Sequence, residues 1–312
     1  MSPYRIIFMG TPEFAVPTLQ TLHDNHHHVL AVVTQPDRPK GRGRVMVAPP
    51  IKDVATGYGY HVLQPAKMKE AWVRGEFMAL KPDLFVVVAY GHILPASVLA
   101  IPRLGAINIH ASVLPLYRGP APIQRAIING DEDTGVTTMW MDEGMDTGDI
   151  LLTAKVPIGP EDTAQTLHDR LARVGAQCLI DTLHQLASGD LVATPQDHAK
   201  ATVAPFLKKE DGRIDWSKEA KALDAFVRGM TPWPGAFTFL LGKRLKILKA
   251  KHRLRKAEQE PGTVLPGFAG ELNVATGHGI LVLKEVQLES GKRLEIKAFL
   301  RGCPVPPGTV LG

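Results

Sequence analysis

The residues best suited to chemistry lie in the segment Asn108–Gly119, which reads NIHASVLPLYRG. Asn108 and His110 end the run 105–110, which we predict to be a β-strand. Side chains two residues apart leave a strand from the same face, so an amide and an imidazole would converge there. Such a pair can stabilise an oxyanion and move a proton. The same residue types also serve as capping or turn residues, and the pair alone does not decide between these roles.

The loop 141–149 is the second candidate, because it holds four carboxylates and two glycines after a predicted strand. Carboxylates in this position can orient an imidazole and stabilise its protonated form. They can equally cap backbone N–H groups in a polar turn. Their spacing lacks the regular ligand ladder of a calcium loop, so we expect no metal here.

The third candidate is a set of cations that alternate with proline and glycine, at Arg38, Lys40, Arg42 and Arg44. Four cations without packing residues cannot form a core, which leaves a solvated loop or a clamp for phosphate groups. The loop follows a predicted strand, near the edge where the other candidates lie, and this position favours the clamp.

A longer cationic run, 243–256, has eight Lys and Arg and no Asp or Glu. From residue 205 onward there are 19 Lys and Arg against 11 Asp and Glu, whereas the part before it has a net charge of −3. A catalytic part before residue 205, joined to a basic part that binds a polyanion, would explain this asymmetry. A solvated basic surface would explain it too.

The elements that must position these residues alternate in the first half of the chain. Apolar runs without polar alternation, as at 84–89, are typical of strands buried on both faces of a parallel sheet. The sequence predicts strands at 4–9, 29–34, 84–89, 105–110 and 136–141, and helices at 12–22, 50–55 and 162–186. This pattern predicts an α/β fold with a Rossmann-like open parallel sheet, whose functional residues lie at the carboxyl ends of its strands.

The pattern changes after a helix predicted at 218–230. Six short runs separated by turns that contain glycine predict a small C-terminal β-barrel of OB-like type. The predicted strands are 236–241, 245–250, 262–265, 271–275, 280–286 and 294–296. We therefore expect a catalytic domain at 1–189, a linker at 190–207 and a basic domain at 208–312. Trp216 and Trp233 are expected in the core of the last domain.

Length and composition agree with this division. A chain of 312 residues favours two domains, and 45% hydrophobic with 21% charged residues excludes a disordered chain or a coiled coil. The longest uncharged apolar stretch is too short to span a membrane, and the start lacks the regions of a secretory signal. The two cysteines form no CxxC pair, and Cys178 lies on the apolar stripe of a predicted helix. We expect a cytoplasmic protein without membrane association or a disulfide framework.

The motif 108–119, followed by GMDTG at 144–148, resembles the signature of the folate-dependent formyltransferase family. The agreement extends over nearly the whole chain, and it is greatest with the members of the family that act on tRNA. The matching segments are GTPEF at 10–14, QPDRPKGRGR at 35–44, AYGHILP at 89–95, KEDGRIDW at 209–216 and PWPG at 232–235. The departures are small: Val113 and Thr231 replace the usual Leu and Asn, and the run Val45–Val47 is less polar than usual.

The resemblance implies transfer of the formyl group of 10-formyltetrahydrofolate, the co-substrate, to the α-amino group of methionyl initiator tRNA. It places the catalytic trio of the family on Asn108, His110 and Asp146. It places the folate-binding residues on Ser112, Val113, Leu114 and Pro115, and the walls of the pterin pocket near Ile93, Leu94 and the loop 142–146. The cationic loop, with Arg38, Lys40, Arg42 and Arg44, would hold the acceptor end of the tRNA. We expect a monomer that needs no metal.

Two other functions remain open on the sequence alone. A related enzyme could formylate the amine of a nucleotide-linked sugar, but a small substrate does not need the two cationic clusters. The chain could also be a non-catalytic RNA-binding protein on an α/β scaffold. Asn108, His110 and Asp146 argue against that function.

Overall fold

The computed structural model describes residues 4–40, 43–255 and 257–312. By their contacts these residues form two compact units. The first comprises the chain up to residue 119 together with 134–157 and 168–204, and the second comprises 120–133, 158–167 and 205–312. The boundaries expected at 189 and 208 remain a prediction, because this division follows compactness and not chain order.

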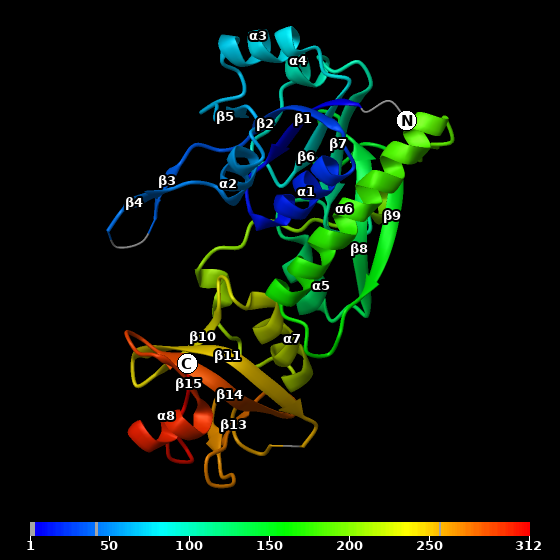
Figure 1. Ribbon diagram of the computed structural model, residues 1–312. Helices are drawn as coiled ribbons and strands as arrows, with labels where there is room; N and C mark the ends of the chain where they lie inside the picture. Colours follow the sequence, from blue (N-terminus) through cyan, green and yellow to red (C-terminus); the bar gives the residue numbers. More distant parts are fainter. Residues whose placement is uncertain (1–3, 41–42, 256) are drawn as a thin grey trace. The chain divides into compact units, whose positions relative to one another are not determined.

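A seven-stranded sheet in the order β5-β2-β1-β6-β7-β8-β9 forms the framework of the first unit (Figure 1). Its strands are β1 (Arg5–Gly10), β2 (His28–Val33), β5 (Val62–Leu63), β6 (Leu84–Val88), β7 (Gly105–His110), β8 (Asp133–Trp140) and β9 (Ile150–Pro157). The pairs from β5 to β7 are parallel, whereas β7 and β8 are antiparallel. The predicted α/β class is confirmed. The sheet is mixed and not wholly parallel, because β8 enters it in the opposite direction.

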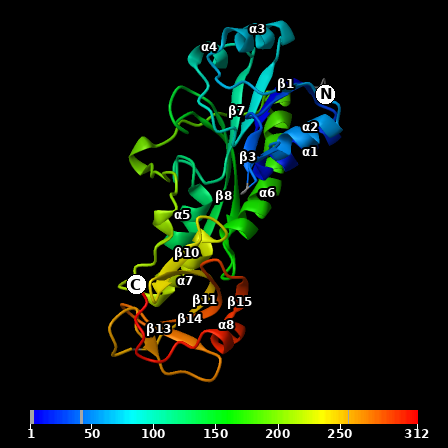
Figure 2. The ribbon, with the colours of Figure 1, turned by 90° about the vertical axis from the view of Figure 1, so that its left-hand side faces the viewer.

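Helices cover both faces of this sheet. The helices of the unit are α1 (Val16–Asp24), preceded by the 3-10 turn η1 (Glu13–Ala15), α2 (Pro50–Gly57), α3 (Ala71–Leu80), α4 (Ala96–Leu99) and α6 (Ala164–Ser188), with a further turn η2 (His198–Lys200). Figure 2 shows α1, α2 and α6 on the same face. On the other face, α3 and α4 contribute Val73, Phe77 and Val98 to one core with strand residues such as Ile7 and Val87.

The centre of the sheet is buried from solvent. All five residues of β6 are buried, as expected for a strand with helices on both faces. Because β1, β6 and β7 are parallel neighbours, their carboxyl ends meet at one edge of the sheet. This edge is where functional residues of open α/β sheets lie, and β7 ends there at His110.

A small hairpin follows β2. Its strands are β3 (Arg38–Lys40) and β4 (Val45–Val47), and Figure 1 shows it extending away from the sheet. The sequence predicted only a loop here. All three residues of β4 are exposed although they are apolar. The first unit therefore carries a short β-arm at the position of the cationic cluster.

The second unit has an antiparallel sheet in the order β10-β11-β14-β13-β12, with β15 paired to β14. Its elements are α5 (Pro122–Asn129), η3 (Glu210–Gly212), α7 (Ala220–Met230), β10 (Ala236–Leu240), β11 (Lys243–Arg253), β12 (Val264–Leu265), β13 (Leu272–Ala275), β14 (Ile280–Leu288), β15 (Arg293–Glu295) and α8 (Ile296–Gly302). The predicted C-terminal β domain is confirmed. Among the described strands β10 and β12 remain at the edges, so the sheet is an open half-barrel and not a closed barrel.

The core of the second unit joins this sheet to α7. Leu223 and Val227 of α7 pack with Leu245 and Leu281 of the sheet. Trp216 is 6% exposed and belongs to the same core, as predicted. The prediction was wrong for Trp233, which is 52% exposed, because it follows the end of α7 in a proline-rich turn outside the apolar face.

Candidate active site

Strand β7 carries Asn108 and His110 to the carboxyl edge of the sheet. Ile109 points to the opposite face, where its side chain lies close to Gly175 of α6. The alternation of a strand therefore places Asn108 and His110 together on the face away from α6. His110 is buried, with 6% of its surface exposed, and Asn108 is half-buried.

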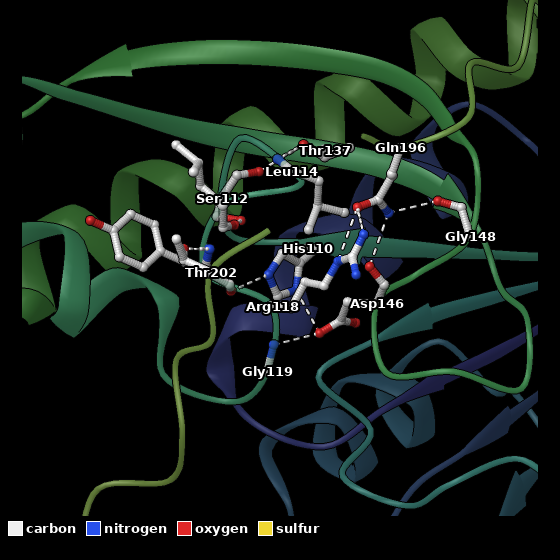
Figure 3. Close-up of polar contacts among 12 residues, drawn as sticks. His110, Ser112, Leu114, Arg118, Gly119, Thr137, Asp146, Gly148, Gln196 and Thr202 are labelled. Atoms are coloured by element: carbon white, nitrogen blue, oxygen red, sulfur yellow. Dashed lines mark hydrogen bonds and ion pairs between the residues drawn. The ribbon is translucent and has the colours of Figure 1, made fainter. Parts of the chain in front are cut away.

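The imidazole of His110 lies between two oxygen atoms (Figure 3). Its Nε2 is 2.9 Å from the carbonyl oxygen of Tyr117, and its Nδ1 is 3.6 Å from Oδ2 of Asp146. A carbonyl oxygen only accepts, so Nε2 carries a hydrogen in this arrangement. The distance at Nδ1 is too long for a hydrogen bond and corresponds to a loose charge contact.

Asp146 is fixed by its backbone surroundings. Its Oδ2 accepts a hydrogen bond of 2.7 Å from the N–H of Gly119. Its φ of +55° lies in the left-handed region, which aspartate tolerates better than most residues. Earlier in the same loop, Asp142 accepts from the N–H of Gly144 and from the hydroxyl of Thr147. The acidic loop thus delivers one carboxylate to His110 and uses another to hold its own turn.

The predicted folate stretch forms a tight internal turn. Ser112 and Leu114 are buried, and the Ser112 hydroxyl donates to the carbonyl of Leu116 at 2.5 Å. Thr137 of β8 donates its hydroxyl to the carbonyl of Ser112 and accepts from the N–H of Leu114. Val113 and Pro115 are half-buried, so they are the residues of this stretch with side-chain surface left for a ligand.

The two predicted pocket walls differ in exposure. Ile93 is 89% exposed, whereas Leu94 is 4% exposed and packs in the core with Tyr90 and Val98. The turn before them has left-handed residues at Ala89 and Gly91. Ile93 therefore presents an apolar side chain to solvent near the carboxyl end of β6.

The cationic cluster lies on the β3–β4 arm, as far as the structure describes it. Arg38 and Arg44 are exposed, while Arg42 and the side chain of Lys40 lie outside the described residues. The base of the arm is well held, because Asp37 accepts hydrogen bonds from Gln64 and Lys52. The Gln64 amide, followed by the Lys52 ammonium, lowers the pKa of the Asp37 carboxyl below its ordinary value.

Four polar residues around the trio were not singled out from the sequence: Arg118, Thr137, Gln196 and Thr202. Figure 3 shows their side chains around His110 and Asp146. Arg118 lies inside the motif 108–119, so the motif could have pointed to it. Gln196 and Thr202 come from a segment without periodicity, and only the folded chain brings them to the site.

Two sequence profiles match most of the chain. The profile of the formyl transferase family covers residues 4–183, and that of its C-terminal domain covers 207–304. The methionyl-tRNA formyltransferase of Geotalea uraniireducens is 53% identical over 312 residues, which are 100% of this chain and 99% of that protein. The chain belongs to the methionyl-tRNA formyltransferase family. The family expected from the motifs is thereby confirmed.

Other members of the methionyl-tRNA formyltransferase family agree to a similar degree. The one from Geobacter sulfurreducens is 51% identical, with 100% of this chain and 98% of that protein covered. The fold is shared more widely. HypX from Aquifex aeolicus, solved in complex with tetrahydrofolic acid, is 20% identical, with a TM-score of 0.64 over 96% of this chain and 47% of that chain.

An N-formyltransferase solved with a nucleotide-linked amino sugar has the same fold. The N-formyltransferase from Helicobacter canadensis, solved with folinic acid and dTDP-3-aminofucose, has a TM-score of 0.67. It is 17% identical, and the match covers 93% of this chain and 100% of that one. At this identity the likeness concerns the fold alone, and the full-length relatives above decide the family.

Within residues 4–40, 43–255 and 257–312, three or more His, Cys, Asp or Glu side chains nowhere gather in a way that could hold a metal ion. In the same part of the chain, all helices are too short or too polar to cross a membrane.

Proposed function

We propose that Asn108, His110 and Asp146 catalyse the transfer of the formyl group of 10-formyltetrahydrofolate to the α-amino group of methionyl initiator tRNA. Formylation of methionyl-tRNA for translation initiation (EC 2.1.2.9) is the activity of this chain, in agreement with its full-length relatives. The identity of the formyl donor and the roles of the residues are the proposed part. The observation that supports them is the approach of Asp146 to within 3.6 Å of His110, on the face of β7 that also carries Asn108.

The reaction needs a stabilised oxyanion more than a strong base. The α-amino group has an ordinary pKa of about 7.7–8.0, so a useful fraction is neutral at pH 7. Its lone pair attacks the formyl carbon, and the formyl oxygen becomes an oxyanion. The Asn108 amide can donate to this oxygen, and one such donor contributes about 2.7–4 kcal/mol to the transition state.

His110 moves the proton that the attacking amine loses. Because Nε2 keeps its hydrogen for the carbonyl of Tyr117, Nδ1 is the ring atom with a lone pair. Protonation at Nδ1 gives an imidazolium, which the Asp146 carboxylate beside it stabilises. The proton then passes to the folate nitrogen as its bond to the formyl carbon breaks, and tetrahydrofolate leaves.

The folate would lie against the apolar side chains at this edge of the sheet. Ile93 is exposed there, and Val113 and Pro115 keep part of their surface free. Flat heteroaromatic rings bind to apolar surfaces that also offer a few polar groups. The backbone of the loop 142–146 can supply such polar groups. The side chain of Met145 in this loop is 57% exposed and adds apolar surface.

The tRNA would be held by phosphate contacts. Arg38 and Arg44 lie exposed on the β3–β4 arm, and β11 presents further lysines and arginines on the second unit. Contacts of this kind give affinity rather than base reading. Because aminoacylated tRNA is the acceptor, we place the protein in the cytoplasm. We also propose that it acts as a monomer.

A formyl-transfer assay tests the function. Purified protein is supplied with 10-formyltetrahydrofolate and with either methionyl initiator tRNA or a dTDP-linked amino sugar. We expect formyl-methionyl-tRNA to form and the amino sugar to remain unmodified. Formylation of the sugar with no reaction on tRNA would contradict the proposal.

A further inference from the structure

The segment Thr194–Ala204 runs along the loops that carry the catalytic trio. At its start, Thr194 and Ile150 exchange two backbone hydrogen bonds of 2.8 Å. At its end, Arg118 donates its N–H to the carbonyl of Thr202 at 2.8 Å and accepts from the N–H of Ala204 at 2.7 Å. The segment is therefore an ordered part of the first unit, although it has no regular helix or strand over most of its length.

Gln196 uses its whole hydrogen-bonding capacity inside this structure (Figure 3). Its Nε2 donates to the carbonyl of Asp146 at 2.9 Å and to the carbonyl of Gly148 at 2.7 Å. Its Oε1 accepts from Nε of Arg118 at 3.1 Å and from Nη2 of the same guanidinium at 2.7 Å. Gln196 is 6% exposed and Arg118 8%, so these bonds are shielded from water and their loss would leave buried polar atoms unpaired.

This arrangement acts directly on the backbone of Asp146. A non-glycine residue with φ of +55° is held there by its surroundings, because the left-handed region is disfavoured for residues that carry a Cβ. Gln196 binds the carbonyl of this residue, and Gly119 binds its carboxylate. Together these two bonds hold the Asp146 carboxylate in the direction that faces His110.

Thr202, although exposed, contacts the backbone on the other side of His110. Its hydroxyl accepts a hydrogen bond of 2.8 Å from the N–H of Tyr117. Tyr117 is also left-handed, with φ of +60°, and its carbonyl receives Nε2–H of His110. The position of the carbonyl that selects the tautomer of His110 thus depends on Thr202.

We infer that Gln196 and Thr202 are positioning residues for catalysis, Gln196 through Asp146 and Thr202 through Tyr117 and His110. The segment Thr194–Ala204, which leads to the second unit, therefore positions catalytic residues in addition to connecting parts of the chain. This inference rests on the proposed function, because it assigns the two residues to the proton transfer proposed for His110.

The first test compares variants of Thr202 in the full-length protein. Thr202→Val removes the acceptor for Tyr117 with little change in volume, and Thr202→Ser keeps it. We expect Thr202→Val to lower kcat about tenfold, with KM for both substrates within twofold, because misplacement of about 1 Å can reduce a rate up to about 10²-fold. Thr202→Ser should restore most of the rate, which a role in packing alone would not predict.

The second test uses Gln196→Glu. This variant keeps an acceptor for Arg118 but replaces the two N–H donors by an oxygen that repels the carbonyls of Asp146 and Gly148. We expect kcat to fall by about 10²-fold with KM little changed. Asp197→Asn is the matched control, since Asp197 is exposed and bonds only within its own turn among the described contacts.

Thermal unfolding of each variant separates catalysis from folding. If Gln196→Glu does not fold, the Thr202 pair decides. Folded Thr202→Val and Gln196→Glu variants that keep kcat within twofold of the wild type would overturn the inference. So would an equal loss in Thr202→Ser. A wild-type protein that does not formylate methionyl-tRNA would instead contradict the proposed function.

Discussion

At the scale of single residues, His110 shows how neighbouring groups divide a task. From the sequence we expected carboxylates of the loop 141–149 to orient the imidazole and to stabilise its protonated form. In the structure the carbonyl of Tyr117 binds Nε2–H at 2.9 Å and thereby orients the ring as well. Asp146, 3.6 Å from Nδ1, is placed to stabilise charge once a proton arrives.

Asp146→Asn tests this division. The amide oxygen can still accept from Gly119, so the loop should keep its shape, but the negative charge is lost. We expect kcat to fall by about 10- to 100-fold, with KM for 10-formyltetrahydrofolate little changed, since general acid–base catalysis contributes about 10²–10⁴. Steady-state kinetics measure both constants. Asp181→Asn on the exposed side of α6 removes the same charge away from the site, and an equal loss there would refute the assignment.

The two cysteines should differ in reactivity. Cys178 is 4% exposed, and burial raises the pKa of its thiol, whereas Cys303 is only partly buried. Because the thiolate is the nucleophile, Cys178 should stay unmodified by iodoacetamide at pH 8 in the folded protein, while Cys303 reacts. Mass spectrometry of the peptides checks this. Modification of Cys178 at the rate of Cys303 would show that α6 does not bury it.

At the scale of elements, the sequence predicted the parts with strong local signals. The strand Gly105–His110 was predicted with the bounds that the structure gives, and the long helix α6 was predicted within two residues at each end. Short elements such as α3 and α5 were missed, because eight to ten residues give little periodicity. The contacts of Gln196 depend on segments about 50 and 78 residues away along the chain, so local patterns could not reveal them.

The packing of α5 on α7 depends on one glycine. A Cβ at Gly229 would lie 2.6 Å from Cγ1 of Ile128 and 3.0 Å from the carbonyl oxygen of Gln124. Gly229→Ala should therefore destabilise the protein by about 1–3 kcal/mol, as overpacking does. Gly75→Ala in α3 is the matched control, because a Cβ there meets nothing within 4 Å and should stabilise the helix by about 0.5–1 kcal/mol. Urea unfolding measures both, and equal stabilities would contradict close packing at Gly229.

At the scale of the whole molecule, carboxylates partly offset the positive charge of the second unit. The excess of Lys and Arg from residue 205 onward lies partly on β11, but some of these cations form ion pairs. Lys249 and Lys251 face Glu161, and Arg253 binds Glu271 at 2.9 Å. The number of cations in the run 243–256 therefore overstates the positive charge that tRNA would meet.

Salt should weaken the binding of tRNA selectively. Phosphate contacts release counterions, so raising salt from about 50 to 200 mM should increase KM for methionyl-tRNA about tenfold or more. KM for 10-formyltetrahydrofolate should stay within twofold, because apolar contacts dominate its proposed site. A KM for tRNA that does not change with salt would show that the cations of the arm and of β11 take no part in binding.

The central claim is that Asn108 and His110, on one face of β7, stabilise the oxyanion and move the proton of formyl transfer. Single-turnover formylation, with enzyme in excess over methionyl-tRNA and 10-formyltetrahydrofolate saturating, measures this step without product release. Asn108→Ala should lower the rate by about 10²–10³-fold while thermal stability and both KM values stay close to those of the wild type. A folded Asn108→Ala variant that transfers the formyl group within threefold of the wild-type rate would contradict the claim.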